Sequence, residues 1–169
     1  LDRFDEVQQE YLLREAEKHP EFTVLSCSQL NSNGKDTRPY GLFLTPTTLT
    51  SFLRSLYLLT HKKLKPATLR SGAVAIYPEW VSGSIMLISR KNFDRLGGWS
   101  EDFWMYYEDA DLCKRIAESG GKVVLIKSIQ IIHNHGGASR INLDVKALTK
   151  SEVIISRHLY IHKHSRGLS

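Results

Sequence analysis

Short β-rich runs alternate with helical stretches along most of this chain, and this alternation restricts the fold more than any other feature of the sequence. The runs expected to be strands are 22–30, 73–77, 80–90, 122–126 and 129–133. The stretches expected to be helices are 5–18, 49–60, 91–98, 109–119 and 143–162. Strands that alternate with helices are typical of α/β folds, in which helices cover a sheet. We therefore predict one α/β domain over residues 1–169.

Composition agrees with a folded domain of ordinary size. The chain has 169 residues, of which 41% are hydrophobic, and this is enough for a real core. No run of 18 or more apolar residues occurs, so no membrane span is expected. Cys27 and Cys113 make no disulfide framework and favour a reducing compartment. We expect a cytoplasmic location, including the inner face of a membrane.

Basic residues exceed acidic ones, 23 to 18, and they cluster at 61–65 and 157–166. Such clusters can meet nucleotide phosphates or anionic lipid heads, or they can be a solubilising surface, and the sequence favours neither interpretation. No zinc finger or RNA-binding signature is present, so nucleic acid is not an expected partner. Peripheral contact with a membrane remains compatible with the charge.

Three carboxylates, Glu108, Asp109 and Asp111, stand directly behind the aromatic run 103–107. One interpretation is capping, because acidic residues in the first turn of a helix are stabilised by about 0.3–1 kcal/mol each. Asp111 also precedes Arg115 by four residues, which suits a surface ion pair. The other interpretation is proton transfer, because aromatic neighbours can raise the pKa of a carboxyl group toward a value useful for a general base.

A histidine and glycine loop follows the expected strand 129–133. His133 and His135 flank one asparagine, and ligands of open α/β sheets bind at the carboxyl ends of strands. A neutral imidazole there can ligate a divalent ion. The following residues 136–140 suit either phosphate binding through backbone amides or a plain turn. Gly83, inside an expected strand, indicates a close approach by a ligand or another backbone.

The segment 80–139 carries a family resemblance. The residues "WVSGSIMLISRKNFDRLGGWSEDFWMYYEDADLCKRIAESGGKVVLI" and "IIHNHGGAS" resemble the second half of a family 2 inverting glycosyltransferase of the GT-A fold, most like bacterial rhamnosyltransferases. The resemblance implies a GT-A-like, Rossmann-related mixed sheet flanked by helices. It also implies transfer of a sugar from a nucleotide-diphosphate donor to a hydroxyl of a cell-surface polysaccharide or lipid-linked glycan. Residues 141–169 are similar to the closing helix of the family, here basic.

By this resemblance each candidate residue takes a role. Asp109 would be the catalytic base, with Glu108 as the second choice, and Asp111 would cap or orient near the substrate. His133, or alternatively His135, would help to hold Mg²⁺ or Mn²⁺ on the donor diphosphate. The residues expected to line the substrate site are Gly83, Ser84, Trp99, Trp104, Tyr106, Asp111 and His135. The three aromatic members of this set are equally well explained as ordinary core residues.

The family's opening half, with its nucleotide-binding units and aspartate-x-aspartate motif, has no counterpart in this sequence, which starts at Leu1. We therefore expect a chain truncated at its N-terminus that represents the C-terminal acceptor and catalytic portion. A second hypothesis follows from the same observation, namely a non-catalytic glycan-binding or assembly module derived from a glycosyltransferase. An unpaired sheet edge in such a chain would favour a homo-oligomer.

Overall fold

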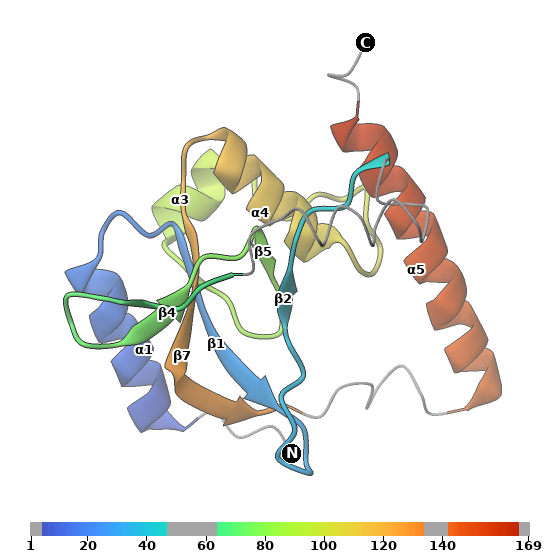
Figure 1. Ribbon diagram of the computed structural model, residues 1–169. Coiled ribbons are helices and arrows are strands. Elements are labelled where there is room, and N and C mark those ends of the chain that lie inside the picture. Colours follow the sequence, from blue (N-terminus) through green and yellow to red (C-terminus); the bar gives the residue numbers. More distant parts are fainter. Residues whose placement is uncertain (1–4, 47–63, 134–141, 166–169) are drawn as a thin grey trace.

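The computed structural model describes residues 5–46, 64–133 and 142–165 (Figure 1). Its helices are α1 (Glu6–Lys18), α3 (Arg90–Arg95), α4 (Glu108–Glu118) and α5 (Leu143–His164). Its strands are β1 (Val24–Leu30), β2 (Tyr40–Gly41), β3 (Ala67–Thr68), β4 (Val74–Ile76), β5 (Trp80–Val81), β6 (Leu87–Ile88) and β7 (Val123–Ile132). The predicted α/β class is confirmed. The expected helix 49–60 lies outside the described residues.

Two long parallel strands, β1 and β7, form the centre of the sheet. The five strands of the main sheet follow the order β3-β4-β7-β1-β6, and β4 and β6 run antiparallel to their central neighbours. The sheet is therefore mixed. Strands β2 and β5 pair separately as an antiparallel ribbon. Both outer strands of the main sheet, β3 and β6, are only two residues long, so its described edges offer short templates for pairing with another chain.

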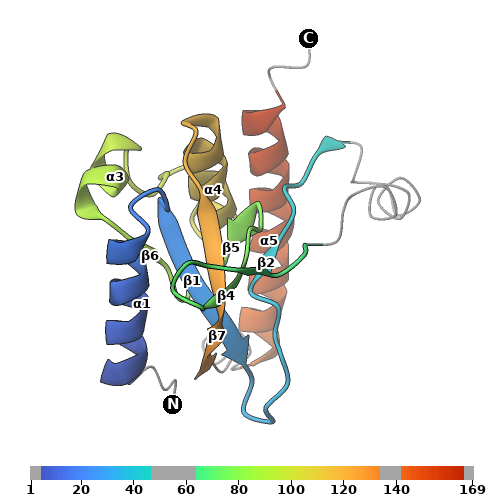
Figure 2. The same ribbon diagram turned by 60° about the vertical axis from the view of Figure 1, so that its left-hand side comes forward.

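Helices cover both faces of this sheet, with α1 on one side and α4 on the other (Figure 2). Leu12 of α1 belongs to the core cluster that contains Leu25 and Ile126. Leu112 and Ile116 of α4, at the predicted i, i+4 spacing, belong to a second cluster. Each helix is thus held by the burial of its apolar side chains against the sheet.

Helix α1 begins with a capping box, in which the Asp5 carboxylate accepts from the backbone N–H of Gln8 and the Gln8 side chain accepts from the Asp5 N–H. Its buried residues are Leu12 and Glu15, whereas Val7 is 75% exposed. Val7 therefore does not belong to the buried face of α1. The second half of α1 therefore makes its contact with the core.

Residues 80–90, expected to form one strand, are divided in the structure. Strand β5 ends at Val81, a turn occupies 82–85, and β6 then pairs antiparallel with the start of β1. Conversely, the two strands predicted over 122–133 form the single strand β7, with an irregularity in its register opposite Cys27 and Ser28. A bulge of this kind lets one strand carry extra residues without ending.

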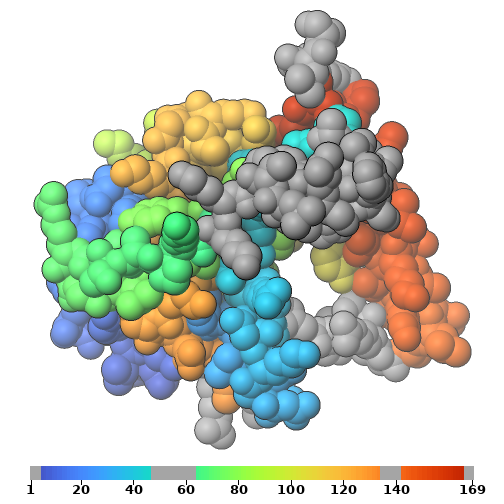
Figure 3. Space-filling model, in the orientation of Figure 1, coloured from blue at the N-terminus to red at the C-terminus, as the bar shows by residue number. Residues whose placement is uncertain are grey.

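Helix α5 confirms the helix expected from Leu143 and ends two residues later than predicted, at His164. Its buried residues, Ser156 and Tyr160, both lie in its second half. In the first half Leu143 is 81% exposed and Leu148 is 52% exposed. Figure 3 shows an open space between the cyan segment that follows β1 and the orange-red helix α5. No helix in the described ranges is long and apolar enough to cross a membrane.

Candidate functional site

The carboxylate of Asp109 lies where the start of α4 meets the turn 82–85. Its Oδ2 accepts a hydrogen bond from the backbone N–H of Gly83 at 3.1 Å, and its Oδ1 accepts from the N–H of Ala110 at 2.7 Å. A Cβ placed on Gly83 would lie 3.5 Å from Cβ of Asp109 and 3.7 Å from Cη2 of Trp99. The structure therefore brings together three of the residues singled out by sequence, Gly83, Trp99 and Asp109. At Gly83 the neighbour that the structure shows is the Asp109 side chain, not a ligand or another backbone.

The surroundings of both adjacent carboxyl groups favour their protonated forms. Burial raises the pKa of Asp109, and the hydrogen bonds from Gly83 and Ala110 only partly oppose this effect. Burial also raises the pKa of Glu108, with a further contribution from the negative charge of Asp109. Oε2 of Glu108 is buried and has no hydrogen-bond partner among the residues that the structure describes. A carboxylate with raised proton affinity suits the acceptance of a proton from a hydroxyl group.

The backbone in front of these carboxylates is strained. Tyr106 has φ +67° and Tyr107 has φ +66°, both left-handed values that non-glycine residues rarely adopt. Tyr107 is also the N-cap of α4, without a side-chain capping hydrogen bond. Each such residue costs about 1–3 kcal/mol, and strain of this kind is concentrated at functional sites. The two tyrosines set the position at which α4 begins, and hence the position of Asp109.

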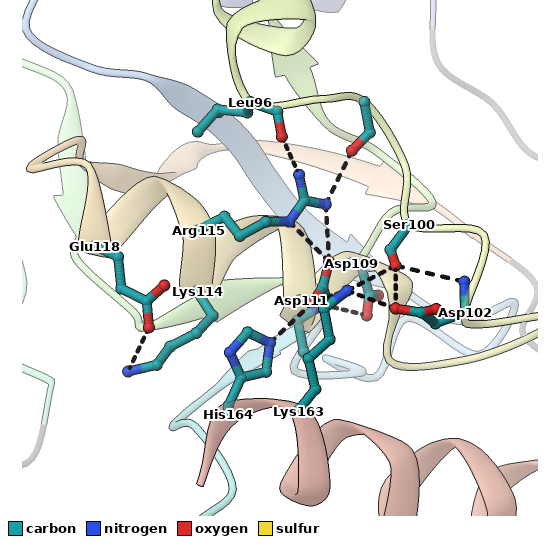
Figure 4. Close-up of polar contacts among 12 residues, drawn as sticks. Leu96, Ser100, Asp102, Asp109, Asp111, Lys114, Arg115, Glu118, Lys163 and His164 are labelled. Atoms are coloured by element: carbon teal, nitrogen blue, oxygen red, sulfur yellow. Dashed lines mark hydrogen bonds and ion pairs between the residues drawn. The ribbon is translucent and has the colours of Figure 1, made fainter. Parts of the chain in front are cut away.

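Asp111 is fully buried on another side of α4, and three basic side chains surround its carboxylate (Figure 4). Oδ2 lies 2.8 Å from the guanidinium of Arg115, while Oδ1 lies 2.9 Å from Nε2 of His164 and 3.2 Å from Nζ of Lys163. Burial alone would raise the pKa of Asp111, but the hydrogen bonds from His164 and Arg115 outweigh it, so the pKa is lowered. These contacts favour the orienting role for Asp111 over direct contact with a substrate.

The same cations hold residues 96–107, which we call the aromatic segment. The guanidinium of Arg115 donates to the carbonyl oxygens of Leu96 and Gly98. Nζ of Lys163 donates to Oγ of Ser100 at 2.7 Å and to Oδ2 of Asp102 at 2.8 Å. The hydroxyl of Ser156 donates to the carbonyl of Met105 at 2.6 Å. Helices α4 and α5 therefore fix this segment from two directions.

Aromatic rings of this segment reach the surface. Trp104 is 67% exposed and Trp99 is 45% exposed, with an edge-to-face contact between Trp99 and Phe93. Tyr106 is half-buried. Exposure of two indole rings is unusual for core residues and is common at binding surfaces.

Ser84 is exposed, and its hydroxyl contacts the side chains of Ser82 and the fully buried Gln29. The sequence analysis did not select Gln29, although a glutamine inside an apolar run is a detectable signal. It also did not select Lys163 and His164 individually, because no spacing rule connects them to Asp111. Their contact depends on how α5 packs.

His133 follows β7 directly, and its backbone N–H donates to the carbonyl of Leu30 at 2.8 Å. It therefore lies at the carboxyl ends of the two central strands, as the sequence predicted. Within the described ranges no group of three or more His, Cys, Asp or Glu side chains could hold a metal ion. These residues do not by themselves fit a metal site. His135 and the loop 136–140 lie outside the described residues.

Comparison with known proteins connects this site to glycosyltransferases. Residues 61–136 match the family described as the N-terminal domain of galactosyltransferase. The N-acetylglucosaminyl-diphospho-decaprenol L-rhamnosyltransferase of Mycobacterium tuberculosis (strain H37Rv) is 38% identical over 55 residues, which are 32% of this chain and 18% of that protein. Rhamnosyltransferase WbbL of Escherichia coli (strain K12) is 31% identical over 86 residues, 50% of this chain and 31% of that protein.

The matched segments thus span less than a third of the length of these relatives. The resemblance read from the sequence is confirmed over that part: the chain is related to glycosyltransferases of family 2 and is distantly homologous to bacterial rhamnosyltransferases.

Proposed function

We propose that the protein is an inverting glycosyltransferase of the GT-A type and that Asp109 is its catalytic base. The starting point is the similarity of part of the chain to bacterial rhamnosyltransferases. The observation that carries the proposal is the Asp109 carboxylate itself. It is held at 3.1 Å by the Gly83 N–H and its pKa is raised by burial, and Trp99 also approaches Gly83. Glu108, adjacent and with a raised pKa as well, is the second candidate.

In the proposed reaction the donor is a sugar linked to a nucleoside diphosphate. The acceptor hydroxyl gives its proton to a carboxylate oxygen of Asp109, and its oxygen forms the new bond to the anomeric carbon. The bond from that carbon to the diphosphate oxygen breaks on the opposite face, and the nucleoside diphosphate leaves with the electron pair. Attack on one face and departure from the other inverts the anomeric configuration. The base must therefore lie opposite the leaving group.

We propose that the acceptor binds along the aromatic segment. Trp99 and Trp104 offer flat, amphipathic faces to a sugar ring, and the exposed hydroxyl of Ser84 lies next to Gly83. The name of the M. tuberculosis relative specifies an acceptor, N-acetylglucosaminyl-diphospho-decaprenol. By analogy we propose a lipid-linked glycan as the acceptor class, with peripheral contact between the protein and a membrane that carries it.

A divalent ion remains a separate proposal. His133 would be one ligand, with other ligands from the donor diphosphate and from outside the described residues. No step above depends on the ion. If the proposal holds, Mn²⁺ should selectively broaden the imidazole resonances of His133 and leave those of the buried His19 sharp. Equal broadening of the two histidines would count against the assignment.

Asp109→Asn tests the proposed base. The amide keeps a similar shape but cannot accept the proton, so transfer should fall by a factor of roughly 10²–10⁴, while binding of the nucleotide sugar is unchanged. Asp94→Asn is the matched control, because Asp94 forms an exposed ion pair with Arg90 on α3, and it should transfer at the normal rate. Retained transfer by Asp109→Asn would exclude this residue as the base.

A non-catalytic glycan-binding module is the second candidate, and the 67% exposure of Trp104 favours it. In that case Trp104→Ala would weaken binding of an acceptor glycan, whereas the wild-type protein would transfer no sugar at all. Measurement of acceptor binding and of transfer on the same preparation separates the two functions.

A further inference from the structure

Gln29 is a fully buried amide at the carboxyl end of the central strand β1. A buried amide without partners is strongly unfavourable. Its Nε2 donates to Oγ of Ser84 at 2.9 Å, and the Ser84 hydroxyl lies 3.1 Å from its Oε1. A hydroxyl can accept one hydrogen bond and donate another. Ser84 therefore supplies side-chain partners for both ends of the Gln29 amide.

The contact between Gln29 and Ser84 lies further along β1 than the last backbone pair between β1 and β6. Strand β6 pairs with β1 only at Val24 and Leu25. Further along β1 the hydroxyl of Ser26 donates to the carbonyl of Ile85 at 2.8 Å, and Gln29 then binds Ser84. Side chains of β1 thus hold the turn 82–85 against the strand where no strand pairing holds it.

Gly83 lies between the two serines of this turn. Ser82 and Ser84 approach each other at 3.0 Å through their hydroxyl oxygens, and the Ser84 N–H donates to Oγ of Ser82. The N–H of Gly83 donates to Oδ2 of Asp109. A continuous path of hydrogen bonds and one covalent step therefore connects Gln29 in the core with the carboxylate on α4.

We propose that Gln29 and Ser84 are positioning residues for the carboxylate of Asp109, acting through the turn 82–85 and the N–H of Gly83. Neither residue transfers a proton. Together they fix the direction of the Gly83 N–H, and that N–H fixes one oxygen of Asp109. The inference rests on the proposed function only where it calls Asp109 a base. The effect of Gln29 and Ser84 on the Asp109 carboxylate is a property of the folded chain.

The effect of Gln29 and Ser84 on Asp109 can be measured as a change in the pKa of the Asp109 carboxyl group. The Gly83 N–H stabilises the charged carboxylate, so a misplaced turn should raise the proton affinity of Asp109. The other ionisable groups near this carboxylate are Glu108, which precedes it, and the buried thiol of Cys113 one turn further along α4. The substitutions below change neither of them.

The experiment is a pH titration of the Asp109 carboxyl carbon by NMR in the full chain, for Gln29→Leu and Ser84→Ala. Both variants should shift the apparent pKa of Asp109 upward by about 0.5–1 unit, since they weaken one hydrogen bond to the carboxylate. Ser84→Thr keeps the hydroxyl and should titrate like the wild type. Ser28→Ala, a buried position of the same strand, is the matched control and should also leave Asp109 unchanged.

A Ser84→Ala variant that folds and leaves the pKa of Asp109 unchanged would overturn the proposal. Because Ser84 is exposed, this variant decides the question even if Gln29→Leu fails to fold. The titration needs neither donor nor acceptor, so its result does not depend on the proposed function. Absence of sugar transfer by the wild type would reject the proposed function but not the positioning role of Gln29 and Ser84. In an active enzyme the acidic limb of the pH profile for kcat should move to higher pH by the same shift in Gln29→Leu.

Discussion

Asp109 and Asp111 are two residues apart on one helix and have opposite environments. A separation of two residues rotates a side chain by about 200° around a helix, so the two carboxylates face different parts of the molecule. Burial with only backbone partners raises the pKa of Asp109. Asp111 is fully buried, but its hydrogen bonds with His164 and Arg115 lower its pKa. The surroundings of Asp109 suit proton transfer, whereas those of Asp111 suit a structural role.

Asp109→Asn should stabilise the fold at neutral pH while it removes the proposed activity. The folded-state pKa of Asp109 is raised, so its charged form costs stability, and this cost grows as pH rises from the unfolded-state pKa to the folded-state pKa. The amide has no such cost and can still accept the Gly83 N–H. Thermal melts should therefore give a higher Tm for the variant at pH 7 and converge with the wild type below about pH 4. A lower Tm at pH 7 would contradict this account.

Asp111→Ala should be strongly destabilising, because it leaves Arg115, Lys163 and His164 without their common anion. We expect a loss of about 3 kcal/mol in the free energy of unfolding, measured by urea denaturation at pH 7. Because the folded-state pKa of Asp111 is lowered, its contribution is present above the unfolded-state pKa and is lost as pH falls through the folded-state pKa. The gap between variant and wild type should shrink in that acidic range.

The exposed ion pair between Asp94 and Arg90 provides the control for Asp111. Asp94→Ala should cost less than about 1 kcal/mol, because exposed ion pairs contribute little. Similar losses for the two alanine variants would mean that Asp111 is not the centre of a supporting network.

At the scale of elements, α5 is the part of the fold that holds the aromatic segment in place. Lys163 and Ser156 contact it directly, and Tyr160 packs against Tyr107 with ring centroids 5.5 Å apart. The segment contains no helix or strand of its own between α3 and α4. Its conformation is therefore determined by these contacts, by Arg115 and by its two left-handed tyrosines.

Lys163→Met should loosen the aromatic segment without unfolding the sheet. The variant keeps the aliphatic stem but loses the bonds to Ser100, Asp102 and Asp111. Chymotrypsin should then cut after Trp104, Tyr106 or Tyr107 several times faster than in the wild type. Lys150→Met, on the exposed first half of α5, is the control and should be cut at the wild-type rate. Equal cutting rates for both variants would show that Lys163 does not hold the segment.

Some elements could be read from the sequence, and the exceptions have physical causes. The long strand β1, the helix α4 and the helix α5 were predicted because their apolar pattern or turn residues are local signals. The break between β5 and β6 was missed, because the side chains that hold the turn 82–85 belong to a distant strand. Asp109 was selected as the candidate base through its aromatic neighbours and the family motif. Gln29 was not selected, because the sequence shows a polar residue in an expected strand but does not show its contact with Ser84.

At the scale of the whole molecule, the structure has a tightly packed centre and a less buried periphery. Strands β1 and β7 are buried along most of their length, with helices on both faces. The first half of α5 contributes no buried residue. Regions with few buried apolar contacts open at a lower free energy than the core.

Amide hydrogen exchange should follow this division. We expect the slowest exchange in β1 and β7, intermediate exchange in α4 and in residues 156–164 of α5, and faster exchange in residues 143–155 of α5. The measurement is native-state exchange by mass spectrometry at neutral pH. Protection of residues 143–155 equal to that of β7 would mean that another surface covers them in solution.

The paired left-handed tyrosines at 106 and 107 also set a condition for protein engineering. A designer who grafts this acidic turn onto another scaffold has to transplant its unfavourable torsions together with its side chains. Glycine at either position would relax the backbone torsion. It would also remove the tyrosine ring, and with it the contacts that fix where α4 begins. A D-amino acid with the same phenol, installed by chemical synthesis, would keep both and would make the graft easier to fold.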